Sequence, residues 1–418
     1  MSFSTARTVD VLGIGFGPAQ LALAYALADE GLGGRAVFLE AQDGFRWHPG
    51  MLLPEATMQI NFTKDLVTPR RPTHWASFLN YLHEQGRLSS FTNLKTMFPT
   101  RAEFSDYLGW AADRVPCEVR YGRRVRSVDW DAGLGRFVVA AGEQLWHARH
   151  LVAGMGLRPR LPEGVEEGAR IWHTEHLLPR LEAFGAREAH RFMVVGAGQS
   201  AAEAVRHLLH AFPRSEVLAV MQGYGFAPAD DSPFVNRVFD PEAVDEFYAA
   251  SPAGRAHLLR AHRNTNYSVV DAELIHELAR LEYEQRRGPE PRFLLRNLTS
   301  LVACAEREGG VEAELRDLRD GARSRERVDA LVLATGYRPA SPAALVERPE
   351  RIFAGLRDGV PEVDRMYRVR LDEGVHGLST TLLSTVAVRG GEIAGELART
   401  LGVRAPAALA AGAAGAAG

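Results

Sequence analysis

The stretch that decides the fold is residues 8–18, TVDVLGIGFGP, near the start of a chain of 418 residues. Its first half, Thr8–Gly13, predicts a short buried strand, and the apolar run Ala19–Leu27 behind it predicts a helix. A further apolar run, Arg35–Glu40, predicts a second strand. A strand, a glycine-rich turn, a helix and another strand in this order make the βαβ unit of a doubly wound α/β fold.

The turn inside this unit has the residues of a phosphate-binding loop. Gly13 allows a tight turn, Gly15 lets the main chain approach a pyrophosphate, and Gly17 and Pro18 lead into the helix. The helix N-terminus adds backbone donors and a favourable dipole for an anion. Glycines alone also occur in plain turns, but here a strand, a helix and an acid accompany them. Glu40 is placed to accept hydrogen bonds from ribose hydroxyls, which suits FAD, whose ribose carries no extra phosphate.

The same pattern returns in the middle of the chain. Phe192–Val195 and Glu216–Met221 predict two strands, with a helix between them that ends near Leu209. Gln222 follows the second strand, where a carboxylate would repel a 2′-phosphate, so this unit favours NADPH over NADH. The preference is expected to be modest, because Gln222 supplies no positive charge. The residues expected to bind NADPH in the turn are Gly196, Gly198, Gln199 and Ser200.

Two such units predict an α/β fold with two Rossmann-like dinucleotide-binding domains, one for FAD and one for NADPH, plus a small helical substrate domain. The helical part is read from residues 234–287, which are rich in helix formers and charges. Thr335, Gly336 and Tyr337 follow a late strand, Ala330–Ala334, and are expected to contact NADPH. They also mark the return to the FAD domain, whose final helix is expected to start near Gly391. The predicted boundaries are 1–165 and 336–405 for the FAD domain, 166–229 and 291–335 for the NADPH domain, 230–290 for the helical domain and 406–418 for a disordered tail.

Composition excludes several other classes of protein. The formal net charge is −3, which argues against nucleic-acid binding through a basic surface. The two cysteines, Cys117 and Cys304, lie far apart in the sequence, so a disulfide scaffold, a metal site and a redox dithiol are not expected. No apolar run is long enough to cross a membrane, and no signal peptide is apparent. We therefore expect a cytoplasmic protein with no membrane partner. Separately, we expect it to form a homo-oligomer.

Lys64 and His48, which follow the first βαβ unit, are weighed here as candidates for a site. Of 49 basic residues only Lys64 and Lys95 are lysines, so a lysine is expected where arginine cannot substitute. A compact ammonium at Lys64 suits a substrate carboxylate, whereas a solvated surface charge is the alternative and is the interpretation for Lys95. His48 by itself is more typical of a structural histidine. Asp231 and Ser232 are most simply read as helix caps.

Several longer stretches resemble the microbial N-hydroxylating flavin monooxygenases, and in particular the L-ornithine N5-monooxygenases of hydroxamate siderophore pathways. The similarity spans about residues 9 to 400. It rests on WHPGMLLPEATMQINFTKDLVTPRRPT from Trp47, FPTRAEFSDYLGWAA from Phe98, DDSPFVN from Asp230, TNYSVV from Thr265, and HGLSTTLLS, which ends at Ser384. These motifs are far more specific than the glycine turns.

The resemblance implies a role for residues that spacing alone leaves open. It places Trp47, His48 and Gln59 with the FAD, and Gln59 near the flavin ring. It implies that Lys64, Asn236 and Asn266 hold the ornithine backbone, with Asn266 also near NADPH, and that Ser384 approaches the substrate amine. Where the ornithine enzymes often have an arginine at the NADPH adenosine, this chain has Gln222.

The implied reaction is hydroxylation of the side-chain amine of L-ornithine with NADPH and O2, through a C4a-hydroperoxyflavin and without a protein nucleophile or a metal. A lysine N6-monooxygenase, or an enzyme for another small amine, shares this chemistry and stays open. A disulfide reductase needs a dithiol that the chain lacks. A Baeyer–Villiger oxygenase needs a motif that Trp172 and His173 do not provide. A non-catalytic flavin-binding regulator is the alternative from another class.

Overall fold

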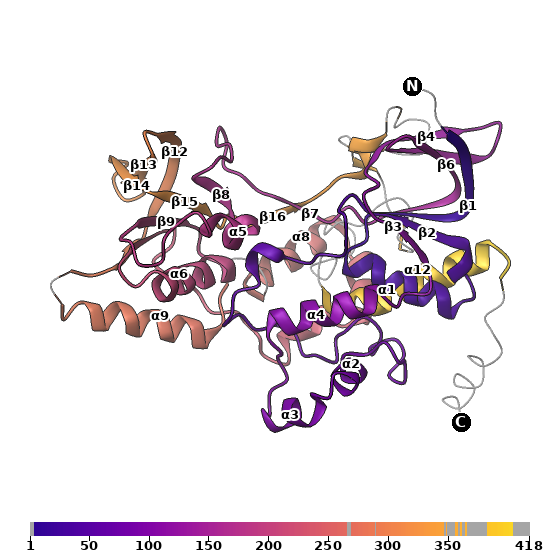
Figure 1. Ribbon diagram of the computed structural model, residues 1–418, viewed down its shortest axis with the longest axis horizontal. Coiled ribbons are helices and arrows are strands. Elements are labelled where there is room, and N and C mark those ends of the chain that lie inside the picture. The colour runs from indigo at the N-terminus through magenta and orange to yellow at the C-terminus, as the bar shows by residue number, and fades with distance from the viewer. Residues whose placement is uncertain are drawn as a thin grey trace.

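The computed structural model describes residues 4–265, 269–288, 290–346, 348, 356–357, 360–361, 364–365 and 383–403. Two β-sheets lie toward opposite ends of the molecule, each with its own helices (Figure 1). The chain crosses between them on β7 (Leu157–Pro159) and returns on β16 (Tyr337–Pro339). These two strands pair with each other in an antiparallel ribbon, so the second unit is inserted into the first through a double connection.

The first sheet belongs to the unit that contains the N-terminal glycine turn. Its strand order is β3-β2-β1-β6-β5-β4, in which β3, β2, β1 and β6 are parallel and β5 and β4 are antiparallel. Its strands are β1 (Ser4–Ile14), β2 (Ala36–Leu39), β3 (Glu118–Arg120), β4 (Val125–Asp131), β5 (Arg136–Ala141) and β6 (Gln144–Ala153). Its helices are α1 (Pro18–Asp29), α2 (Phe78–Glu84), α3 (Leu88–Asn93), α4 (Arg101–Ala112) and α12 (Val386–Thr400).

The second sheet is fully parallel, with the order β11-β10-β9-β15-β8. An antiparallel three-stranded sheet lies beside it. The parallel strands are β8 (Ile171–His173), β9 (Arg191–Val195), β10 (Glu216–Val220), β11 (Phe293–Arg296) and β15 (Ala330–Leu333). The others are β12 (Thr299–Arg307), β13 (Gly310–Asp317) and β14 (Arg323–Val328), and the helices are α5 (Leu177–Leu181) and α6 (Gln199–Ala211). The two predicted βαβ units are thus both present, within one or two residues at most strand ends.

The predicted helical segment contains α7 (Pro241–Ala249), α8 (Pro252–Ala261) and α9 (Ala272–Gln285). The third of these helices is not separate from the second unit. Leu274 and Leu278 of α9 are buried in the same core as α6 and β9. The apolar spacing of three and four along α9 is therefore explained by packing onto the parallel sheet.

The expected start of the last helix was wrong. Helix α12 begins at Val386, five residues before Gly391, and both Gly390 and Gly391 lie inside it. The glycines serve close packing, because a Cβ at Gly390 would lie 3.1 Å from the backbone nitrogen of Leu23 in α1. The sequence predicted a helix start near these glycines, but Gly390 allows contact between two helices and a Cβ at Gly391 would lie 2.5 Å from the Cδ of Arg70.

Short single-turn helices complete the described elements. They are η1 (Gly33–Arg35), η2 (Pro49–Met51), η3 (Thr174–His176), η4 (Val235–Phe239), η5 (Arg263–Thr265), η6 (Pro342–Leu345) and η8 (Leu383–Thr385), with a small hairpin of β17 (Leu356–Arg357) and β18 (Val360–Pro361).

The two units are interlocked as well as tethered. Met51, Leu53 and Ala56 follow the first βαβ unit in sequence, yet their side chains are buried in the core of the second unit. The loop that carries the predicted site residues is therefore anchored at one end by the second unit.

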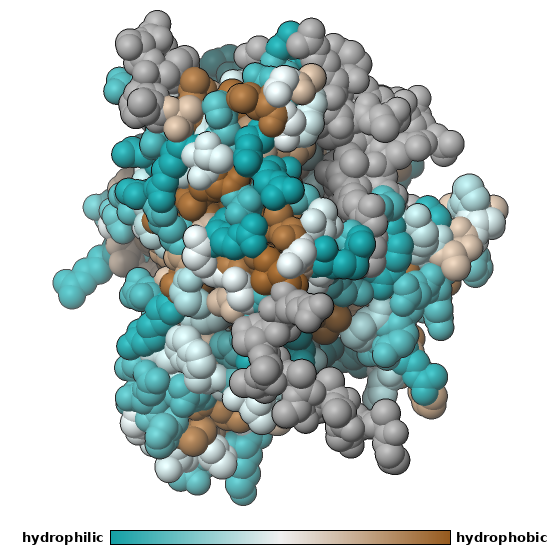
Figure 2. Space-filling view, turned by 90° about the vertical axis from the view of Figure 1, so that its right-hand side faces the viewer, coloured by the Kyte–Doolittle hydropathy of each residue, from teal (hydrophilic) through white to brown (hydrophobic). Residues whose placement is uncertain are grey.

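At the end of the molecule seen in Figure 2, hydrophobic residues appear in small groups separated by hydrophilic ones. Within the described part of the chain, no helix is both long enough and apolar enough to cross a membrane.

Candidate active site

A large cavity of about 2340 Å³ opens between the two units. It is lined by both glycine turns and by the loop that contains Lys64. Of the predicted site residues, Gly13, Gly15 and Glu40 do not line it themselves, and Asn266 lies outside the described residues. The remaining predicted residues all line it: Gly17, Pro18, Trp47, His48, Gln59, Lys64, Gly196, Gly198, Gln199, Ser200, Gln222, Asn236, Thr335, Gly336, Tyr337 and Ser384.

The first glycine turn leaves room for a phosphate group. Gly15 has a φ of +82° and a Cβ there would lie 2.3 Å from the carbonyl oxygen of Gly154, so only glycine fits. At Gly17 no atom lies within 4 Å of the Cβ position. Gly17 is also the N-cap of α1, and no side chain caps that helix end. An open helix N-terminus of this kind, facing a cavity, binds anions such as a pyrophosphate.

Glu40 supports the same assignment. It is buried at the end of β2, and its two carboxylate oxygens accept hydrogen bonds from the backbone nitrogens of Phe16 (2.6 Å) and Gln42 (2.8 Å). Each carboxylate oxygen can accept more than one hydrogen bond, so acceptor positions remain for the hydroxyls of a ribose. The residues of this turn therefore fit FAD.

The second glycine turn is built in the same way. A Cβ at Gly196 would lie 2.3 Å from the carbonyl oxygen of Ala334, and Gly198 caps α6 without any side-chain hydrogen bond. This N-terminus also opens onto the cavity, which fits the pyrophosphate of NADPH. Gln222 lies just beyond the end of β10, is exposed, and lines the cavity.

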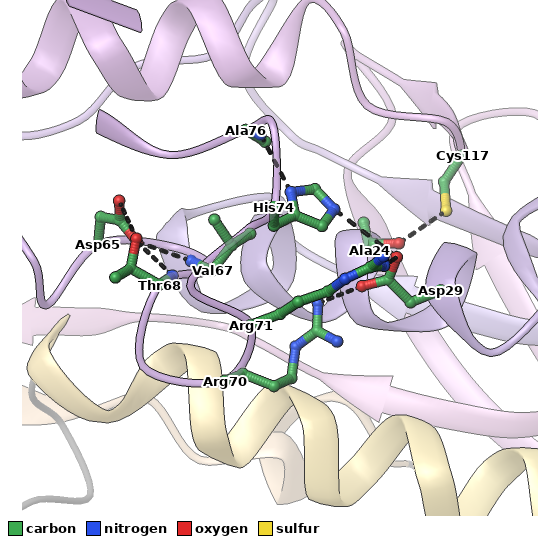
Figure 3. A network of polar contacts seen from close by, with 10 residues as sticks. All are labelled: Ala24, Asp29, Asp65, Val67, Thr68, Arg70, Arg71, His74, Ala76 and Cys117. Atoms are coloured by element: carbon green, nitrogen blue, oxygen red, sulfur yellow. Dashed lines mark hydrogen bonds and ion pairs between the residues drawn. The ribbon is translucent and has the colours of Figure 1, made fainter. Parts of the chain in front are cut away.

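Lys64 lies on a loop held in place by its neighbour. Its side chain lines the cavity and is half-buried, and among the described residues its ammonium has no carboxylate partner. Asp65 is buried, and its carboxylate accepts hydrogen bonds from the backbone nitrogens of Val67 and Thr68 (Figure 3). It also accepts from the Thr68 hydroxyl and from the backbone nitrogen of Phe78 at the start of α2. The backbone that carries Lys64 is therefore fixed by four hydrogen bonds.

A second carboxylate secures the far end of this loop. Asp29, at the end of α1, pairs with Arg70 at 2.5 Å and with Arg71 at 3.0 Å, as Figure 3 shows. His74 lies beside the same carboxylate, at 3.7 Å. Burial lowers the pKa of His74, although the Asp29 charge acts in the opposite direction. The loop is thus bound to α1 as well as to α2.

Two other predicted substrate residues face the same cavity. Asn236 lies in η4 and its side-chain nitrogen donates to the carbonyl oxygen of Asp231 at 2.8 Å, which leaves its side-chain oxygen available. Ser384 is buried in η8, directly before α12. The Ser232 hydroxyl accepts a hydrogen bond from the backbone nitrogen of Val235 at 3.4 Å, but the N-cap of η4 is Phe234 and not the predicted Asp231 or Ser232.

His48 and Trp47 lie where the cavity meets the connection between the units. The His48 backbone is in the left-handed region, with a φ of +47°, and its ring lies edge-on to Trp47 and to Tyr337. Desolvation by the surrounding protein, together with the Arg101 charge, lowers the pKa of His48 to about 4, so it is neutral near pH 7. A neutral histidine at this place can donate or accept a hydrogen bond without adding charge.

The return connection is fixed by a buried histidine. His173 accepts a hydrogen bond at Nδ1 from the backbone nitrogen of Glu175, so its Nε2 carries the proton and donates to the carbonyl oxygen of Gly336 at 3.1 Å. Burial lowers the pKa of His173 to about 4 and raises the pKa of Tyr337 to about 12. Thr335, Gly336 and Tyr337 therefore form a rigid link as well as part of the cavity wall.

The sequence did not reveal three polar residues that join the units. Arg101 begins α4 and forms two hydrogen bonds, of 2.9 and 2.8 Å, with the carboxylate of Glu203 in α6. Asp271, the N-cap of α9, accepts a hydrogen bond from the side chain of Gln59. One signal could have indicated Glu203: it is a carboxylate among alanines on the buried side of a helix.

The chain is similar to characterised flavin-dependent N-hydroxylases. The model of the L-lysine 6-monooxygenase/L-ornithine 5-monooxygenase family matches residues 7–339. The L-ornithine N(5)-monooxygenase of Burkholderia cepacia is 42% identical over 356 residues, which cover 81% of this chain and 80% of the relative. The ornithine N-hydroxylase of Kutzneria sp. 744, in a structure with reduced FAD, NADP+ and L-ornithine, matches with a TM-score of 0.89 and 38% identity, over 94% of this chain and 100% of that one. The L-lysine 6-monooxygenase of Pseudomonas syringae matches with a TM-score of 0.82 and 33% identity, over 94% and 100%. This chain belongs to the L-lysine 6-monooxygenase/L-ornithine 5-monooxygenase family.

Proposed function

We propose that this protein hydroxylates the side-chain nitrogen of L-ornithine with NADPH and O2. The observation that carries the proposal is the shared cavity: one space is lined by two phosphate-binding helix ends and by a half-buried Lys64 that lacks a carboxylate partner among the described residues. Ornithine supplies that carboxylate. Two relatives named for ornithine are 42% and 38% identical to this chain and the lysine enzyme is 33% identical, a level that an ornithine enzyme of Beauveria bassiana also has.

The N-terminus of α1 and Glu40 hold FAD, and the N-terminus of α6 holds NADPH. When bound, these cofactors supply the reducing power and the activated oxygen that hydroxylation requires. The protein binds the substrate at both ends, with Lys64 and Asn236 at the amino-acid end and Ser384 at the amine end. A rigid loop under Lys64 matters because hydroxylation depends on a fixed distance from the carboxylate to the reacting nitrogen.

The protein must also present the amine without its proton, since only the neutral amine has a lone pair. An alkyl amine has a pKa near 10, and lowering it to about 8 costs roughly 3 kcal/mol. Partial desolvation in the cavity acts in that direction because it disfavours the charged form. The N5-hydroxyornithine formed has the hydroxylamine group from which hydroxamate siderophores are made, and we propose that use for the product.

The decisive experiment compares amines of different length. Purified protein is supplied with NADPH and, in turn, ornithine, lysine, putrescine and aspartate, and hydroxylamine formation is measured. Lysine is one methylene longer, and a misplacement of about 1 Å can cost about 100-fold, so ornithine should give far more product. Equal yields from ornithine and lysine would remove the ornithine assignment but keep the flavin chemistry. NADPH oxidation that no amine stimulates, with no hydroxylamine, would remove the N-hydroxylase itself.

Three predictions from the sequence accompany this proposal. The first is the domain division given above, in which the unit before β7 and after β16 binds FAD and the unit inserted between these two strands binds NADPH. The protein is expected to act in the cytoplasm and to form a homo-oligomer. Light scattering of the purified protein at several concentrations tests the last point.

A further inference from the structure

A buried carboxylate outside the cavity joins the two cofactor-binding units. The exposed fraction of Glu203 is 1%, and its side chain lies behind the second glycine turn in α6. Its partner Arg101 comes from the other unit, at the start of α4, and is itself largely buried. The same guanidinium also donates to the carbonyl oxygen of Met51 at 2.9 Å. Since water reaches neither charge well, each charged group is stabilised mainly by its ion pair with the other.

The carboxylate of Glu203 also holds the first residue of α6. Gln199 donates from Nε2 to Glu203 Oε1 at 3.0 Å. Gln199 lines the cavity at the turn that fits NADPH. The Gln199 amide is orientated a second time by Asp271, because Nε2 donates to Asp271 Oδ2 at 2.8 Å and Oε1 accepts from the backbone nitrogen of Asp271 at 2.9 Å. Both polar atoms of the Gln199 side chain therefore form hydrogen bonds, which fix the orientation of the amide group.

The last of these hydrogen bonds returns to the flavin-binding unit. The other oxygen of Asp271, Oδ1, accepts from Gln59 Nε2 at 3.0 Å. The sequence of contacts is Arg101–Glu203–Gln199–Asp271–Gln59, and it begins and ends in the flavin-binding unit while its middle lies in the second unit. Four of its five members line the cavity, and Glu203 alone lies behind the wall.

We propose that Glu203 is a positioning residue that sets the place of the NADPH-binding turn relative to the flavin-binding unit. It acts through Arg101, which ties α6 to α4, and through Gln199, whose orientation it fixes at the turn. Glu203 itself does not line the cavity. The inference rests on the proposed cofactor arrangement. It predicts that a protein without this carboxylate still binds both cofactors but transfers hydride from NADPH to the flavin more slowly.

The test uses the intact protein with FAD bound and the substitution Glu203→Gln, which keeps the size of the side chain but removes its charge. A side-chain nitrogen then faces donors on Arg101 or Gln199, so the chain of contacts breaks. The matched control is Glu326→Gln, because Glu326 pairs with Arg191 and Arg296 entirely within the second unit. Flavin reduction at saturating NADPH and flavin reduction by dithionite are measured for each protein. Hydrogen exchange is measured at the backbone amides of Met58 and Arg101, which donate to the carbonyl oxygens of Pro99 and Ala56.

For Glu203→Gln we expect NADPH-driven reduction to slow by about tenfold or more, since small misplacements have large effects on transfer rates. Dithionite reduction should be unchanged, and amide exchange at Met58 and Arg101 should speed up. The control should match wild type in all three. A Glu203→Gln protein that is reduced by NADPH at the wild-type rate overturns the proposal, and so does a control that slows equally.

If Glu203→Gln does not fold, Asp271→Asn tests the same chain of contacts at a half-exposed position. It should also slow NADPH-driven reduction while dithionite reduction stays normal, and a normal NADPH rate would overturn the proposal. Failure of the proposed cofactor arrangement is distinguishable from both results, because then the wild-type protein itself is not reduced by NADPH. Failure of the N-hydroxylation alone is also distinguishable, because wild type then oxidises NADPH but forms no hydroxylamine.

Discussion

Gly50 in η2 lies so close to Glu175 in η3 that a Cβ at Gly50 would fall 1.9 Å from the carbonyl oxygen of Glu175. Two backbones from different units meet at this point without any side chain between them. Gly50 is buried, and the next residue, Met51, enters the core of the second unit. The contact therefore depends on the absence of a single methyl group.

The first prediction follows from that contact. Gly50→Ala should lower the free energy of unfolding by about 1–3 kcal/mol, the usual cost of overpacking, since the obstacle is backbone and cannot rotate away. Urea unfolding followed by fluorescence measures the change. Gly44→Ala is the control, because no atom lies within 4 Å of its Cβ position. Equal stability of the two variants would show that η2 and η3 can separate without cost.

The second prediction concerns Lys64. Lys64→Ala should raise the KM for ornithine at least tenfold, because a charge-assisted pair with the substrate carboxylate is lost. Flavin content and NADPH-driven flavin reduction should stay near wild type, and more of the oxygen consumed should leave as hydrogen peroxide. Lys64→Arg should also be poor, since a planar guanidinium places the carboxylate differently.

The control for Lys64 is the other lysine of the chain. Lys95 is exposed and does not line the cavity, so Lys95→Ala should leave the ornithine KM unchanged. Normal ornithine kinetics in both Lys64 variants would place that ammonium outside the substrate site.

The third prediction concerns the support beneath Lys64. Asp65→Asn turns one acceptor oxygen into a donor that faces existing donors, and an unsatisfied buried group costs about 1–3 kcal/mol. We expect a lower free energy of unfolding together with a higher KM for ornithine. Thr68→Val removes only one of the four hydrogen bonds. It should therefore have a smaller effect on the free energy of unfolding and on the KM for ornithine. A changed stability with an unchanged KM would mean that Asp65 supports the fold but not the position of Lys64.

The fourth prediction is about coenzyme choice. Because Gln222 has no charge to pair with a 2′-phosphate, wild type should show a modest NADPH preference with measurable NADH turnover. Gln222→Arg should raise the NADPH-to-NADH ratio of kcat/KM, by about tenfold if the new pair contributes about 1.4 kcal/mol. Complete rejection of NADH by wild type would mean that another cation of the cavity binds the phosphate.

The fifth prediction is a pH dependence of stability. The folded-state pKa of His173 is about 4, whereas an unfolded histidine has a pKa near 6.5. The unfolded chain therefore binds a proton first, so stability is retained above pH 6.5 and falls as the pH drops toward 4. Between pH 7 and pH 5 this one group should remove about 2 kcal/mol. His173→Gln should lose correspondingly less over that interval in urea unfolding, and an identical loss in both proteins would contradict the assignment.

The elements with local signals were predictable. Each glycine turn lies between an apolar strand and a helix, so both βαβ units could be placed from residues such as Gly15 and Gly196. The family motifs directed attention to Lys64, Asn236 and Ser384, and the structure brings all three to one cavity. Roles for these residues stay predictions, and Asn266 and the tail beyond residue 403 lie outside the described residues.

The contacts between units could not be predicted, because they depend on pairs that are far apart in the sequence. Arg101 and Glu203 are separated by 102 residues, and Gln59 and Asp271 by 212. Nothing local to Arg101 indicates which carboxylate it will meet. The start of α12 was misplaced for the same reason, since the need for glycine at Gly390 comes from α1 at the opposite end of the chain.

That pairing of α1 with α12 sets the order in which the protein can be completed during synthesis. At about 5–20 residues per second, α12 follows α1 from the ribosome after on the order of 20–70 seconds. The parallel sheet of the second unit, from β8 to β15, is fully synthesised before α12 appears. Until α12 has been made, α1 packs against the sheet and α4 but lacks its partner helix, so the first unit to begin is the last to be finished.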